Sequence, residues 1–165
     1  MTDFENLAIQ ELIRPILGLP CCRKQVGLLR SLSVGFGARI QHGKPGLKDD
    51  YKGEWELGTY GCAWRVIGDG KILCGSDDSV DSIDELDRAL NHIAFGAIIS
   101  LQRRGRFDIC IELDNNMAID FFASASDDDE LFHIFCPGNK YVRFTAQRGW
   151  ALSDSDKPWS EPPGE

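Results

Sequence analysis

The feature of this sequence that most constrains its fold is a two-residue alternation of apolar and polar side chains through its second half. In residues 107–113, for example, Phe107, Ile109 and Ile111 alternate with Asp108 and other non-aliphatic residues. This alternation is typical of a β-strand with one buried face. Five such segments follow one another: 97–102, 107–113, 117–123, 131–136 and 141–147. Turn signals such as Asn115-Asn116 separate them, so the pattern predicts an antiparallel meander.

The first half predicts further strands. Residues 32–40 alternate apolar side chains with Ser, Gly and Arg, which again indicates a strand. Shorter strands are expected at 54–57, 63–67 and 71–74, the last two joined by a Gly68-Asp69-Gly70 turn. A polar loop over residues 41–53 lies between the first strand and the rest. Long loops of this kind in a compact domain are often functional.

Two helices are predicted. Residues 82–95 begin with Ser82-Ile83-Asp84-Glu85, a capping box, and continue with Leu86, Leu90 and Ile93 at helical spacing. Gly96 is the expected end of this helix. A shorter amphipathic helix is expected over residues 3–17, with Pro15 ending its regular part near Ile13.

These elements predict an α+β fold in a single domain over residues 1–165, with an irregular tail from about residue 153. The domain is expected to be one twisted, mostly antiparallel sheet with a short N-terminal helix. The stripe of the 82–95 helix is expected to pack on one sheet face against these residues: Val34, Phe36, Ile109, Ile111 and Ile119.

The acidic charge of the chain lies in its second half. Residues 1–75 hold 10 Lys and Arg against 8 Asp and Glu, whereas residues 76–165 hold 8 against 18. The acids gather at 77–87 and 127–130 with little basic interruption. An acidic surface repels nucleic-acid phosphates and attracts basic proteins, so direct nucleic-acid binding is not expected. The alternative is that these acids only keep the protein soluble.

Motifs for catalysis are sparse. The sequence has no G-x-S-x-G, Walker, H-E-x-x-H or dinucleotide-binding motif. His133 and Cys136 form an H-x-x-C pair, which leaves a thiol- or metal-dependent enzyme as an alternative. The Asp127–Glu130 loop offers carboxylate ligands for Ca²⁺ or Mg²⁺ but lacks the EF-hand spacing. We expect no cofactor and no bound metal.

The N-terminus and the apolar runs bear on localisation. Asp3 and Glu5 stand where a secretory signal needs basic residues, and no run approaches 18 apolar residues. We therefore expect a cytoplasmic protein without membrane association, whose six cysteines remain thiols.

Several segments carry a resemblance. They are Gly53–Tyr60 (GEWELGTY), Cys62–Ile67 (CAWRVI), 119–122 (IDFF), 126–130 (SDDDE), 132–137 (FHIFCP), Gly149-Trp150 and 157–159 (KPW). Together they resemble small bacterial cytosolic proteins of the immunity type, which are encoded beside toxins of interbacterial competition systems. The resemblance covers most of residues 20–160. It implies a non-catalytic protein that binds and neutralises a cognate toxin, and it carries over no catalytic residue.

The residues independently suit a protein-binding role. Clustered acids speed encounter with a basic partner, and exposed aromatic residues commonly anchor an interface. The predicted partner-binding residues are Asp77, Asp78, Asp81, Asp127, Asp128, Asp129, Glu130, Tyr51, Tyr60 and Trp159. The 127–130 loop is expected to project into solvent. A general protein-interaction module unrelated to toxins is the other binding hypothesis.

Overall fold

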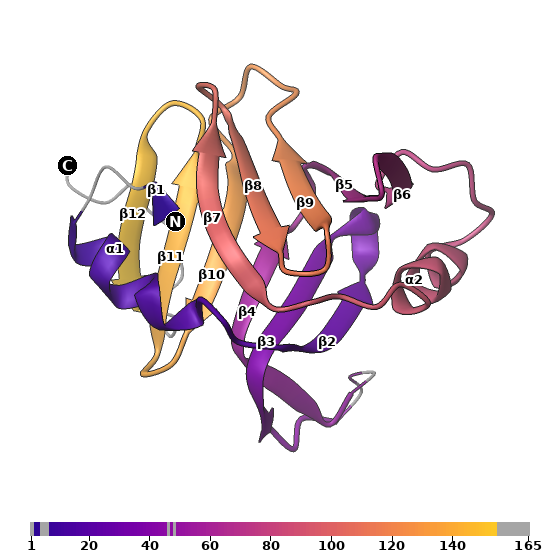
Figure 1. Ribbon diagram of the computed structural model, residues 1–165, viewed down its shortest axis with the longest axis horizontal. Helices are drawn as coiled ribbons and strands as arrows, with labels where there is room; N and C mark the ends of the chain where they lie inside the picture. The colour runs from indigo at the N-terminus through magenta and orange to yellow at the C-terminus, as the bar shows by residue number, and fades with distance from the viewer. Residues whose placement is uncertain (1, 4–6, 46, 48, 155–165) are drawn as a thin grey trace.

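The computed structural model describes residues 2–3, 7–45, 47 and 49–154, and within this part the strands form two six-stranded sheets (Figure 1). Sheet A contains, in spatial order, β1 (Thr2–Asp3), β7 (Ile98–Arg104), β8 (Asp108–Leu113), β9 (Met117–Phe122), β5 (Ala63–Gly68) and β6 (Lys71–Gly75). Sheet B contains β12 (Gly149–Asp154), β11 (Lys140–Thr145), β10 (Glu130–Cys136), β4 (Tyr51–Thr59), β3 (Leu32–Gln41) and β2 (Cys21–Val26). All neighbouring strands are antiparallel except β1 and β7. The predicted antiparallel α+β fold is confirmed, but the strands divide into two sheets where one was expected.

The inner faces of the two sheets form the core. The rings of Phe121 in sheet A and Phe132 in sheet B lie 4.9 Å apart between their centroids. The residues expected to bury the helix stripe, such as Phe36 and Ile109, are fully buried, but they belong to a core cluster built by both sheets. The alternating pattern therefore marks the strand faces that the opposite sheet covers.

Helix α2 (Ile83–Asn91) covers one side of the sandwich, not a sheet face (Figure 1). It contacts β2 and β6, the edge strands of the two sheets, and the Val26 N–H donates to the Asp87 carboxylate at 2.8 Å. The Ser82 cap is as predicted, since Ser82 Oγ accepts from the Glu85 N–H at 3.2 Å. The Glu85 carboxylate accepts from the N–H of Asp81 at 3.0 Å, one residue before the predicted donor Ser82. The helix ends at Asn91, before Gly96. Leu86 and Leu90 are fully buried and Ile83 and Ile93 half-buried.

Helix α1 (Leu7–Ile13) lies at the opposite side and contacts β12 (Figure 1). It ends at Ile13, as Pro15 predicts, and continues as a 3₁₀ turn over Arg14–Ile16. The expected start at residue 3 is wrong, because Asp3 belongs to β1. The two helices thus lie at opposite edges of the two-sheet sandwich, where edge strands otherwise leave backbone groups unpaired.

The edge strands β1, β2 and β12 were not predicted. β2 carries the polar run Arg23-Lys24-Gln25, and β12 ends at Ser153 and Asp154, which pair with Tyr141 and Lys140. The irregular tail expected from residue 153 therefore begins no earlier than residue 155. Residues 155–165 lie outside the described residues.

Truncation of a buried side chain of α2 tests whether this helix packs against the edges of the two sheets. Leu90→Ala leaves a cavity and is expected to lower the free energy of unfolding by about 2–5 kcal/mol. The exposed neighbour Arg88 is the control, and Arg88→Ala is expected to change it by less than about 0.5 kcal/mol. Urea denaturation followed by circular dichroism measures both. Equal midpoints for the two variants would contradict the packing of α2 against the sheet edges.

Candidate functional site

Two of the connections that pass from one sheet to the other are neighbours. Residues 60–62 lead from β4 to β5, and residues 123–129 lead from β9 to β10. Because β4 pairs antiparallel with β10, and β5 with β9, both crossings lie at one corner of the sandwich. A hydrogen bond joins them, from Cys62 Sγ to the Glu130 carbonyl oxygen at 3.5 Å.

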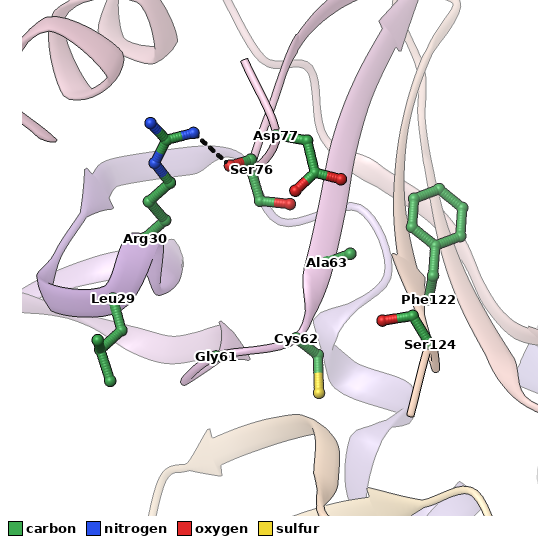
Figure 2. Close-up of a pocket in the computed structure, with 9 residues that line it drawn as sticks. All are labelled: Leu29, Arg30, Gly61, Cys62, Ala63, Ser76, Asp77, Phe122 and Ser124. Atoms are coloured by element: carbon green, nitrogen blue, oxygen red, sulfur yellow. Dashed lines mark hydrogen bonds between the residues drawn. The ribbon is translucent and has the colours of Figure 1, made fainter. Parts of the chain in front are cut away.

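A hollow of about 470 Å³ opens at this corner (Figure 2). We call it the corner hollow. It is lined by residues from four connections: Leu29, Arg30, Gly61, Cys62, Ala63, Ser76, Asp77, Phe122 and Ser124. Figure 2 shows Leu29 and Arg30 on one side of the hollow, and Phe122 and Ser124 on the other. Its volume is within the range of small-molecule and peptide side-chain pockets.

The loop between β2 and β3 forms one wall and holds an unusual backbone. Leu29 and Arg30 have φ angles of 58° and 56°, the left-handed region that costs a residue with a side chain roughly 1–2 kcal/mol. Three hydrogen bonds hold the loop. Trp64 Nε1 donates to the Arg30 carbonyl at 2.8 Å, and the Arg30 guanidinium donates to the carbonyl oxygens of Ser76 and Asp78 at 2.6 and 2.8 Å. The loop leaves Leu28 and Leu29 each 84% exposed.

Both predicted acidic segments reach this corner. Asp77 is exposed and lines the hollow. Asp127 and Asp129 are exposed on the second crossing. Burial, and behind it the charges of Asp129 and Glu130, raise the pKa of the Cys62 thiol against an opposing hydrogen bond with Thr59. Asp77 thus lines the hollow together with Cys62, and Asp129 lies on the second crossing near enough to Cys62 to act on its charge.

Other predicted acids have structural roles. Asp78 accepts a hydrogen bond from the Gly75 N–H at 3.1 Å, which closes a turn. Asp81 is exposed and donates its backbone N–H to Glu85 at 3.0 Å, in front of α2.

Asp128 does not project freely into solvent, which corrects the expectation for its loop. It accepts hydrogen bonds from the Gln147 N–H at 2.9 Å and from Arg148 Nε at 2.7 Å. Burial alone raises its pKa, but these bonds outweigh burial and lower it below its ordinary value. The carboxylate thus ties the second crossing to the turn between β11 and β12.

Tyr60 covers a buried cluster on the outer face of sheet B. Tyr60 is 55% exposed, as predicted, and its ring centroid lies 4.5 Å from that of His133. His133 is 3% exposed, and its Nδ1 has no hydrogen-bond partner among the residues that the structure describes. The nearest acid is Glu130, 4.0 Å from that nitrogen, and Tyr141 donates its hydroxyl proton to the same carboxylate. Burial lowers the pKa of His133 to about 4, so the ring is neutral at pH 7.

The structure separates the residues of the enzyme hypothesis. His133 and Cys136 are three positions apart on β10, so alternation directs them to opposite faces of the sheet. Cys136 belongs to the core cluster, while His133 stacks with Tyr60 on the outer face. Within the described residues, no group of three or more His, Cys, Asp or Glu side chains is placed to hold a metal ion.

Two predicted aromatic residues, Tyr51 and Trp159, are not part of the corner hollow as described, and two leucines of the corner were not predicted. Tyr51 is half-buried and donates its hydroxyl to the Cys22 carbonyl at 3.3 Å, away from the corner hollow. Trp159 lies outside the described residues. The sequence analysis missed Leu28 and Leu29, although two adjacent leucines just before the predicted 32–40 strand were an available signal.

Comparison of the chain with protein-family models, curated proteins and solved structures finds no match. No helix in the described part of the chain has the length and apolar character that crossing a lipid bilayer requires.

Removal of the Asp128 carboxylate is expected to destabilise the fold. Asp128→Ala leaves Arg148 and the Gln147 N–H without this acceptor, and the free energy of unfolding is expected to fall by about 1–2 kcal/mol. Asp129→Ala, on the exposed neighbour, is the control and is expected to change it by less than about 0.5 kcal/mol. Urea denaturation at pH 7 measures both. If Asp128→Ala lowers the free energy of unfolding less than Asp129→Ala does, Asp128 does not stabilise the link between the second crossing and the β11–β12 turn.

The buried His133 is expected to lower the free energy of unfolding as the pH falls. Its pKa is about 4 in the folded protein against an ordinary 6.5, so between these values the unfolded chain binds more protons there. The free energy of unfolding therefore decreases as the pH falls from 6.5 towards 4, and the contribution of His133 to this decrease is about 2 kcal/mol at pH 5. His133→Phe removes this titration and loses no Nδ1 hydrogen bond.

The measurement compares the unfolding free energy of wild type and His133→Phe at pH 7, 6 and 5. Glu130 and Arg143, which also face the cluster, are present in both proteins. We expect the difference to shift in favour of the variant as the pH falls. A difference independent of pH would contradict the neutral, buried histidine.

Proposed function

We propose that this chain is a non-catalytic immunity-type protein, which neutralises a cognate bacterial toxin in the cytoplasm by binding it at the corner hollow. The observation that carries the proposal is the exposure of Leu29 and Asp77 in the corner hollow. Leu28 is exposed on the same loop as Leu29, and Tyr60 and Asp129 are exposed on the two crossings at this corner. Apolar and aromatic anchors within a charged rim are the usual composition of a protein-binding surface.

The backbone of the β2–β3 loop supports the proposal. Two consecutive residues outside the preferred region of φ cost free energy, and the loop directs two leucines into water. Strain of this kind tends to persist where function requires the conformation. Because hydrogen bonds from Trp64 and Arg30 already fix the loop, a partner that binds the leucines need not order it.

The charge supports a basic partner. Asp127 and Asp129 lie on one crossing and Asp77 on the facing turn, and all three are exposed. The guanidinium of Arg30, the cation that lines the hollow, is engaged by two carbonyl oxygens. Exposed acids of this kind accelerate association with a positively charged surface and make it depend on salt.

The experiment uses the product of the gene immediately upstream of this one, which we expect to encode a toxin domain. Co-expression is expected to restore growth of cells that produce that toxin. Binding of the purified toxin is then measured for Leu29→Asn and for Asp129→Lys. Asn adopts the left-handed region more easily than Leu, so Leu29→Asn is expected to keep or slightly raise stability while weakening binding about tenfold. Asp129→Lys is expected to slow association and flatten its salt dependence.

Matched controls stand outside the corner. Ile72→Thr removes an exposed apolar side chain of β6, and Asp50→Lys reverses an exposed acid of the 42–50 loop. Both are expected to bind as the wild type does. An upstream product that does not bind, or binding that the corner variants and the controls affect equally, would overturn the proposal. Binding without any toxic activity of the partner would favour a general interaction module.

A further inference from the structure

A second hollow, of about 400 Å³, lies along β2 and is lined by the cations Arg23, Lys24 and Arg39, which is unusual for a chain with a net charge of −8. Tyr51 and Phe95 contribute aromatic rings to it, and Asp49 contributes a carboxylate. We call it the basic hollow. It is built by β2, by the end of β3, the start of β4 and the loop between them, and by the segment at the C-terminal end of α2.

Arg23 and Asp49 neutralise each other. Arg23 Nε lies 3.0 Å from the Asp49 carboxylate, and Arg23 Nη1 lies 2.5 Å from that of Glu56. The Arg23 side chain is 13% exposed, and it also donates to Ser33 and Gln25. Its donors are therefore used within the chain, and the charge left in the hollow belongs to Lys24 and Arg39.

Lys24 and Arg39 are held on aromatic rings. Lys24 Nζ lies 4.9 Å from the centroid of Phe95, and Arg39 Cζ lies 4.7 Å from that of Tyr51. Within the described part of the chain, neither cation forms a salt bridge with a carboxylate. Lys24 donates to the Ile93 carbonyl, so its position is fixed, whereas Arg39 is exposed and retains its guanidinium donors.

We propose that the basic hollow binds a small oxyanion, a phosphate or a carboxylate, between Lys24 and Arg39. A guanidinium and an ammonium supply charge-assisted hydrogen bonds to either kind of oxygen. Cation–π contacts hold both groups without neutralising them, because a ring carries no net charge. Partial burial lowers the pKa of Lys24, and an anion beside it would offset that loss of hydration.

The experiment titrates the full chain with inorganic phosphate and, separately, with citrate at constant ionic strength. Backbone amide resonances in ¹H–¹⁵N spectra are the readout. Saturable shifts are expected at Cys22, Lys24 and Arg39. Saturation with both anions, or with only one, supports the site and identifies which oxyanion it prefers.

Arg39→Gln is the main variant, because Arg39 is exposed and its substitution is expected to change stability by less than about 0.5 kcal/mol. It is expected to weaken the apparent affinity about fivefold, the effect of one partly exposed charged contact. Arg106→Gln, on an exposed cation in the turn between β7 and β8, is expected to have no effect.

Three results would overturn the proposal: shifts that sodium chloride reproduces, shifts that do not saturate, or equal titrations for Arg39→Gln and Arg106→Gln. The toxin-binding experiment above uses other residues, so failure of either proposal leaves the other standing.

Discussion

The hydrogen bond from the Trp64 indole to the Arg30 carbonyl oxygen, 2.8 Å long, connects the core of this protein to its candidate binding surface. Trp64 is 1% exposed, so the core fixes its ring. Its backbone also binds Ser76, with Trp64 N–H donating to Ser76 Oγ at 3.0 Å and Ser76 N–H donating to the Trp64 carbonyl at 2.9 Å. One buried residue thereby positions both the strained β2–β3 loop and the turn that carries Asp77. The geometry of the corner hollow follows from the packing between the sheets.

The sequence predicted those parts of the fold that local pattern determines. The meander strands and the Ser82 cap of α2 depend on residues a few positions apart, and they lie where the alternation and the capping box indicate. The division into two sheets was not predicted, because alternation marks a buried face without saying what covers it. β2 was missed because its polar run has no alternation, and the acids that pair with Arg23, Asp49 and Glu56, are 26 and 33 residues away.

The site shows the same limit. The exposure of Asp77, Asp127, Asp129 and Tyr60 agrees with the prediction, since short acidic connections between strands usually face solvent. The role of Asp128 depends on Arg148, 20 residues further along, and no spacing rule relates the two positions. The basic hollow was not predicted from the sequence, for a similar reason. Arg39 and Lys24 line one hollow because β3 folds back beside β2.

Two surfaces of opposite charge can act independently on one small domain. β2 begins at Cys21 in the basic hollow and ends at Val26, just before the loop that reaches the corner hollow. As lined by the described residues, the two hollows share no residue. The Debye length at physiological ionic strength is about 8 Å, so salt weakens the interaction between exposed charges of the two hollows. The sign of the local surface, and not the net charge of −8, therefore decides what each hollow attracts.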